Sequence, residues 1–83
     1  MSEIIIDVPD RSLVALKLKP ANAGIEIRMM AAMKLFELGR LSSGAASELA
    51  GIPKPLFLSK LSDFGISAIK HNEKELTEDL ENA

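Results

Sequence analysis

The chain has 83 residues, a formal net charge of −2, and no cysteine, tryptophan or tyrosine. This length predicts one small domain, and the lack of cysteine excludes disulfides and thiolate metal sites. The apolar stretches are too short to span a bilayer and no basic leader follows Met1, so we expect a cytoplasmic protein without a membrane anchor.

The first part of the chain predicts a strand and a short helix. The β-branched run Glu3–Val8, bounded by Pro9, is typical of a strand. Asp10 is a suitable N-cap for a short helix over Arg11–Leu18. Pro20 is expected to end that segment.

The longest predicted helix, Ala23–Leu38, is capped by Asn22 and is apolar around most of its circumference. Because so short a chain has little protein to bury such a helix, we expect a homodimer built on it. Arg28 lies within the apolar arc and is expected to pair with Glu37 or Glu48 at the rim of the interface. The residues expected at the dimer interface are Ile25, Met29, Ala32, Met33 and Phe36.

Residues 41–65 have the spacing of a helix-turn-helix unit. Ser42 or Ser43 can cap a short alanine-rich helix, and Gly51 suits the left-handed turn that follows it. Pro53 and Pro55 suit the start of a second helix. The apolar residues of that helix, which ends at Gly65, are Leu56, Phe57, Leu61 and Phe64. Such a unit commonly places its second helix in the DNA major groove.

Two interpretations of this unit stay open. In the first, Lys54 and Lys60 contact phosphates, with Ser43 and Ser59 close by. The second helix has no Arg, Asn or Gln, which are the side chains that read guanine or adenine edges bidentately. In the second interpretation, the unit is only the scaffold of a protein-interaction module that never touches DNA.

The C-terminal residues predict a segment that binds a partner. Ile66–Lys70 alternates and predicts a short strand able to pair with the N-terminal one, and Asn72 can cap a last helix, Glu73–Leu80. Residues 71–83 carry a net charge of −4, which leaves +2 on the rest. We expect this segment to order on a protein partner. The partner-binding residues are Ile66, Ile69, Glu75, Leu76, Glu78, Asp79 and Leu80.

The sequence offers no catalytic constellation, so we expect no enzyme, no cofactor and no metal site. His71 has only Glu73 and Glu75 as nearby carboxylates. The patterns together predict a mainly α domain. Residues 1–40 hold the strand and the dimerising helices, 41–65 the helix-turn-helix unit, and 66–83 the acidic partner-binding segment.

The order of these elements resembles uncharacterised protein family 0175, small prokaryotic proteins often predicted to be antitoxins. The resemblance lies in Leu38–Ser42, Ala45–Gly51 and Phe57–Ile66, followed by an acidic end. Pro53 and Pro55 depart from the usual pattern. The resemblance implies a DNA-binding autorepressor whose C-terminal end docks on a toxin, often a PIN-domain ribonuclease.

The first forty residues are also arranged like a ribbon-helix-helix repressor, in which the strand pairs with that of the dimer mate and enters the major groove. Here the outward residues of the strand are Glu3, Ile5 and Asp7. Phosphates would repel the two carboxylates. If the N-terminal part dimerises in this way, its strand is a poor reader of DNA.

Overall fold

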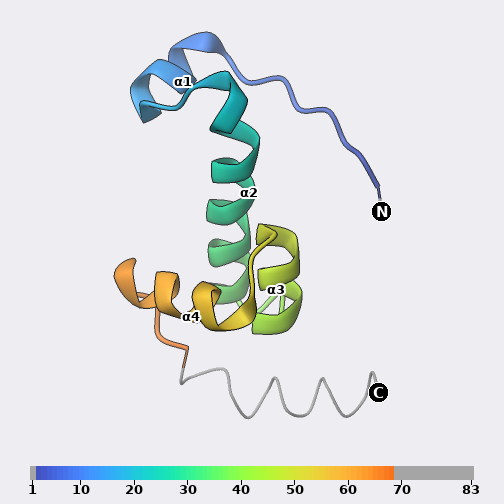
Figure 1. Cartoon of the computed structure of the whole chain (residues 1–83), viewed down its shortest axis with the longest axis vertical. Coiled ribbons are helices and arrows are strands. Elements are labelled where there is room, and N and C mark those ends of the chain that lie inside the picture. The colour runs from blue at the N-terminus through green and yellow to red at the C-terminus, as the bar shows by residue number, and fades with distance from the viewer. Residues whose placement is uncertain (1, 69–83) are drawn as a thin grey trace.

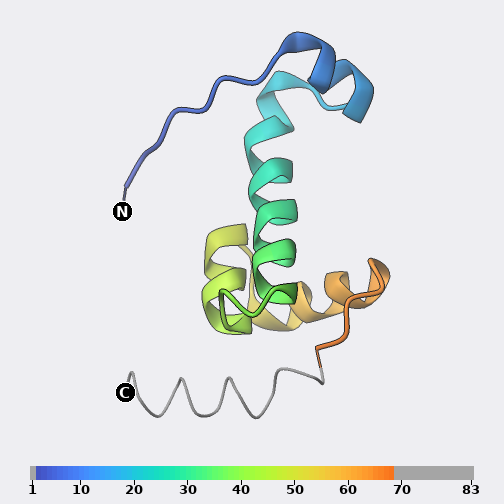
Figure 2. The same cartoon turned by 180° about the vertical axis from the view of Figure 1, so that it is seen from behind.

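Residues 2–68 are described in the computed structural model, and they fold as four helices (Figure 1). These are α1 (Asp10–Leu16), α2 (Pro20–Glu37), α3 (Ser43–Ala50) and α4 (Lys54–Asp63). Both α3 and α4 lie against the C-terminal half of α2, whereas α1 lies beyond its other end (Figures 1 and 2). The prediction of a mainly α fold is confirmed.

The two predicted strands are wrong. Residues 3–8 form an arm without strand pairing, and residues 66–68 form no strand either. Ile69 and Lys70, the rest of the second predicted strand, lie outside the described residues. β-branched residues favour an extended backbone, but a strand forms only where a neighbour pairs its N–H and C=O groups. Within residues 2–68 the arm has no such neighbour.

The starts of α1 and α2 also differ from the prediction. Pro9 and Lys19 occupy the N-cap positions expected for Asp10 and Asn22. Pro20, expected to end a segment, is instead the first residue of α2. A proline fits there because the first turn of a helix leaves its N–H groups unpaired in any case.

Helix α3 begins and ends as predicted. The Ser42 Oγ accepts a hydrogen bond from the N–H of Ala45 at 3.2 Å, which caps the first turn. Gly51 follows the helix with a φ of 75°. The N–H of Ile52 then donates to the carbonyl oxygen of Ser47 at 3.2 Å, the bond that defines a Schellman motif.

Helix α4 ends in the same type of motif. Gly65 has a φ of 72°, and the N–H of Ile66 donates to the carbonyl oxygen of Leu61 at 2.9 Å. Ile66 also packs against the core, as expected for the residue after the glycine in this motif. Pro53 is the N-cap of α4, as its position in the sequence indicated.

The hydrophobic core lies where the C-terminal half of α2 meets α3 and α4. The rings of Phe36 and Phe57 pack edge to face with centroids 6.1 Å apart. Small residues of α3, Ala46, Ser47 and Ala50, are buried, which lets α3 approach α2 closely. The buried core residues are Met29, Ala32, Met33, Phe36, Ala46, Ala50, Phe57 and Leu61.

The face of α2 predicted to form a dimer interface is instead the core of the domain itself. Met29, Ala32, Met33 and Phe36 are each at most 8% exposed. Of the five predicted interface residues, Ile25 alone remains on the surface, at 60% exposure. The prediction is therefore wrong for the other four, because α3 and α4 supply the cover that we had expected from a second copy.

Arg28 also has a different partner from the predicted one. Its Nε–H donates to the carbonyl oxygen of Leu49 at 3.0 Å, whereas Glu37 forms an ion pair with Lys34 at 2.8 Å. No carboxylate among residues 2–68, Glu48 included, forms an ion pair with Arg28. Leu49 lies in the last turn of α3, where carbonyls lack helical partners and the helix dipole favours a cation. Arg28 thus joins α2 to the end of α3.

Candidate nucleic-acid interface

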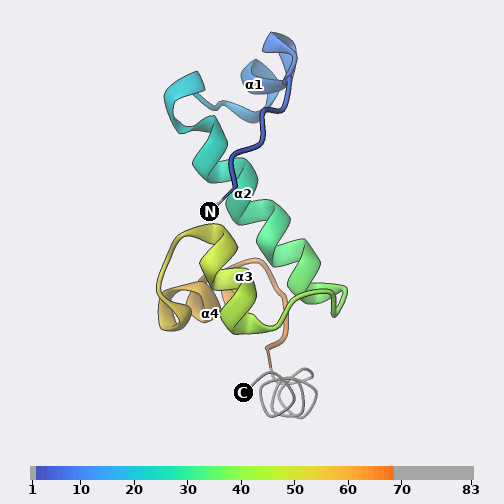
Figure 3. The ribbon, with the colours of Figure 1, turned by 90° about the vertical axis from the view of Figure 1, so that its right-hand side faces the viewer.

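The helix-turn-helix unit is formed by α3, the turn at Gly51 and α4. Helix α3 lies along α2, and α4 runs across the end of α2 in a different direction (Figures 1 and 3). Phe57 and Leu61 are fully buried and attach α4 to the core. The opposite face of α4 therefore stays free for a partner.

Three of the four predicted DNA contacts, Lys54, Ser59 and Lys60, lie on α4. Lys54, the first residue of α4, and Ser59 are both exposed, and Lys60 is half-buried. Leu56 lies between these residues in sequence and is 46% exposed. The surface of α4 thus presents two cations, a hydroxyl and an aliphatic group.

Ser43, the fourth predicted DNA contact, is not on this surface. It is 1% exposed and lies in the first turn of α3 against the interior. Its neighbour Ser42 is the N-cap, which turns Ser43 inward. The hydroxyl of Ser43 is therefore not available to a phosphate in this structure.

Arg40 is a candidate that the sequence analysis missed. It is exposed and lies in the connection between α2 and α3, just before the Ser42 cap. The sequence did contain a signal for Arg40, because a cation just ahead of a serine-capped helix places a guanidinium beside a helix N-terminus. Both the guanidinium and the helix N-terminus favour an anion. With Lys54 and Lys60 it outweighs the exposed carboxylates of this unit, Glu48 and Asp63.

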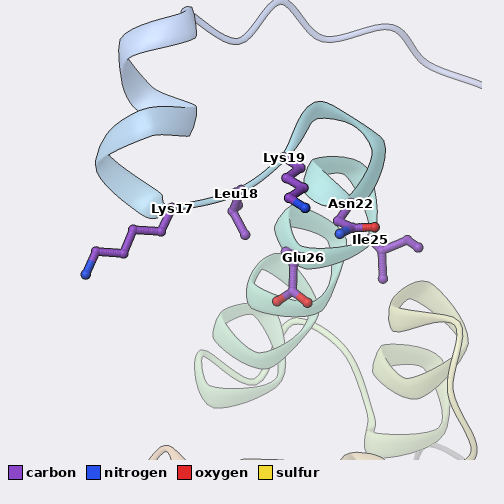
Figure 4. Close-up of a pocket in the computed structure, with 6 residues that line it drawn as sticks. All are labelled: Lys17, Leu18, Lys19, Asn22, Ile25 and Glu26. Carbon is purple, nitrogen blue, oxygen red and sulfur yellow. The ribbon is translucent and has the colours of Figure 1, made fainter.

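A surface hollow of about 310 Å³ lies at the junction of α1 and α2 (Figure 4). The Lys19 side chain extends toward Asn22, whereas that of Lys17 points away from the other lining residues. The carboxylate of Glu26 lines the same hollow. Because both signs of charge are present, we assign no ligand to it.

The part of the chain that the structure describes contains no group of three histidines or carboxylates placed to hold a metal ion. Within that part, no helix is long and apolar enough to cross a membrane. Of the predicted partner-binding residues, Ile66 is half-buried against the core. The others, Ile69, Glu75, Leu76, Glu78, Asp79 and Leu80, lie outside the described residues, as do His71 and the last predicted helix.

Comparison with known proteins gives one family. The family model described as Uncharacterised protein family (UPF0175) matches residues 1–83. A "UPF0175 protein" from Aeropyrum pernix is 38% identical over 78 residues, which cover 94% of this chain and 82% of that protein. No solved structure matches the chain.

Proposed function

This chain belongs to the uncharacterised protein family UPF0175, as its sequence indicated, and on that premise we propose that it is an antitoxin-like, DNA-binding regulator. It would bind operator DNA through α3 and α4, and a protein toxin through residues 66–83. The observation that carries the DNA part is the Gly51 turn between two short helices, with Lys54 and Lys60 on the second.

Phosphate contacts would provide most of the affinity for DNA. Lys54, Lys60 and Arg40 can each neutralise a phosphate, and such contacts orient a protein on the duplex without reading its sequence. Base contacts would come from the Ser59 hydroxyl and from Leu56, whose exposed aliphatic group suits a thymine methyl. We therefore expect modest sequence specificity and a strong dependence on salt.

The test of the DNA-binding proposal is a fluorescence-anisotropy titration of labelled DNA from upstream of the chain's own gene. Measured from about 50 to 200 mM salt, Lys54→Ala and Lys60→Ala should each weaken binding and lower the slope of log K against log salt by about one. The matched control is Lys19→Ala, which removes a lysine outside the helix-turn-helix unit. Undetectable binding at the lowest salt would contradict the proposal.

A second candidate function is a protein-interaction module in which this unit is only a scaffold. The observation that favours it is the exposure of Leu56 at 46% and Phe64 at 60%, at the start and the end of α4. The same fluorescence-anisotropy titration with DNA distinguishes the two candidate functions. A module would bind the product of the neighbouring gene and show no salt-dependent DNA binding.

The toxin-binding part of the proposal rests on the resemblance to antitoxins and on the acidic charge of residues 71–83. Its test is a chain shortened after Ala68, since Ile66 and Ala68 still pack against the core. This chain should keep its helical signal and lose binding to the neighbouring gene's product, expected to be a PIN-domain ribonuclease. A shortened chain that still inhibits that ribonuclease would refute this part.

A further inference from the structure

An apolar groove lies between α2 and the end of α4. Its volume is about 200 Å³, and its lining residues are Met30, Met33, Lys34, Phe64 and Ile66. Met33 is buried and Ile66 is half-buried, whereas Met30 and Phe64 are 43% and 60% exposed. Residues 2–68 therefore leave two large apolar side chains of this groove uncovered.

The groove is too small for a stable contact with a separate protein. Specific interfaces between proteins bury at least about 1,000 Å² in total. A cavity of about 150 Å³ holds one benzene molecule, so this groove accepts only one or two aliphatic side chains. An occupant that buries so little surface stays bound only if it is tethered, because a short tether raises its effective concentration to roughly millimolar.

The chain supplies a tethered segment that begins beside the groove. It turns back after α4 at Gly65, and both Ile66 and Ala68 pack against the core (Figure 1). The described residues end at Ala68, and two residues span at most about 7 Å. The C-terminal segment, residues 69–83, therefore starts close to the part of the groove that Ile66 lines.

We propose that the C-terminal segment occupies this groove in the free chain, with Leu76 and Leu80 as the side chains that enter it. Two residues four positions apart lie on the same side of a helix, so both leucines reach one surface. Residues 69–72 then form a connection of ordinary length between the core and this helix. The contact removes the exposed apolar surface of Met30 and Phe64 from water.

The charges of the groove and of the segment are opposite. Lys34 lines the groove with a side chain that is 66% exposed, and residues 71–83 carry a net charge of −4. Lys34 pairs with Glu37, but an ion pair between exposed side chains is weak and leaves the ammonium available to a second carboxylate. Glu73 shares the helix face of Leu76 and Leu80 and is the carboxylate expected beside Lys34. This inference goes beyond the proposed function, because the contact forms without DNA or a toxin.

The first test is paramagnetic relaxation enhancement in the full chain. The sequence has no cysteine, so Asn82→Cys gives a single attachment point for a nitroxide, two residues after Leu80. The nitroxide should broaden the NMR signals of the Met30 and Phe64 side chains. It should spare Val14, which belongs to α1 beyond the other end of α2. Unbroadened signals of Met30 and Phe64 would overturn the proposal.

Variants of the segment separate a specific contact from mere proximity of a tethered chain. Leu76→Asn combined with Leu80→Asn should abolish the broadening, because it removes both apolar side chains that enter the groove. The matched control, Thr77→Asn, changes a residue between them and should leave the broadening unchanged. All three positions lie outside residues 2–68, which contain the core cluster around Phe36 and Phe57. Equal broadening in the double variant and the control would refute the contact.

A variant of the groove gives the reciprocal test. Met30→Glu should abolish the broadening at Phe64, because it places a carboxylate in the apolar groove and against an acidic segment. The matched control is Ile25→Glu, which alters a residue of the same helix that is 60% exposed and lies outside the groove. If Met30→Glu loses its helical circular-dichroism signal, the double variant of Leu76 and Leu80 decides alone.

A mixed sample tests whether the segment comes from the same chain. Nitroxide-bearing chains without isotope label are mixed with isotope-labelled chains without nitroxide. The signals of Met30 and Phe64 should then stay sharp, since each groove holds its own segment. Broadening in this mixture would mean that the segment of a second copy fills the groove, and it would overturn the intramolecular contact.

Discussion

The arm and α1 differ from the helix-turn-helix half in what their apolar residues contact. In the second half, Phe36 and Phe57 meet inside a core shared by three helices. In the first, the isoleucines of the arm and both Val14 and Leu16 face outward. Both halves have apolar residues at regular spacing. The difference shows that such spacing marks a surface to be covered without identifying what covers it.

The ends of the helices show the same contrast. Gly39 and Gly51 adopt the left-handed conformation after α2 and α3 with φ of 75°. After α1 the same position is taken by Lys17, with φ of 59°. A residue with a Cβ loses about 1 kcal/mol in this conformation. Helix α1 is thus less favourable than α2 and α3 in two respects: it has no buried residue, and the residue that ends it is not a glycine.

The largest effect expected within this comparison is that of Phe57→Ala. Phe57 is fully buried, so its removal should leave a cavity and lower the free energy of unfolding by about 3–5 kcal/mol. Urea unfolding followed by circular dichroism measures this. Ile5→Ala, in the exposed arm, is the control and should change the stability of the monomer by less than about 0.5 kcal/mol. Equal losses for the two variants would abolish the distinction between the halves.

Gly51→Ala should have the next largest effect. The new Cβ would lie 3.8 Å from an Arg28 guanidinium nitrogen, an ordinary contact, so the cost comes from the backbone. A left-handed alanine should lower the free energy of unfolding by about 1–2 kcal/mol. Gly24→Ala, in α2, where a Cβ meets nothing within 4 Å, is the control and should be neutral or stabilising. A neutral Gly51→Ala in the same urea titration would contradict the role of this turn.

Ser42→Ala tests the N-cap of α3. Loss of the Oγ that accepts from the N–H of Ala45 should cost about 1 kcal/mol in the free energy of unfolding. Ser59→Ala removes an exposed hydroxyl within α4 and serves as the control, with an effect close to zero. If both variants unfold at the same urea concentration, the cap contributes nothing.

Lys17→Gly should have the smallest effect of these variants, and it should stabilise the C-terminal end of α1. The glycine relieves the left-handed strain at the end of α1, worth up to about 1 kcal/mol. The amide of Leu18, which donates to the carbonyl of Leu13 at 2.9 Å, should then exchange with solvent about fivefold more slowly. Lys17→Ala keeps a Cβ and should show no such gain. Unchanged exchange in the glycine variant would mean that α1 is limited by packing alone.

Part of the helix-turn-helix unit could be predicted from individual residues. The cap was predicted at Ser42 or Ser43, the turn at Gly51 and the end of α4 at Gly65, and the structure has the cap at Ser42. Lys54 was placed on an exposed surface, where the structure also has it. Arg40 was missed although it lies just ahead of the serine-capped helix, because only the fold shows that it stays exposed beside the unit.

The sequence by itself determined where the helices of the second half begin and end, and to which family the chain belongs. Caps, glycine turns and helix-starting prolines depend on groups within about one turn, so a short window contains their cause. Only the tertiary structure decided that Met33 and Phe36 face α3 and α4, that Ser43 points inward, and that Arg28 bonds to Leu49. Apolar burial is not directional, so the spacing of apolar residues cannot state which distant segment will cover them.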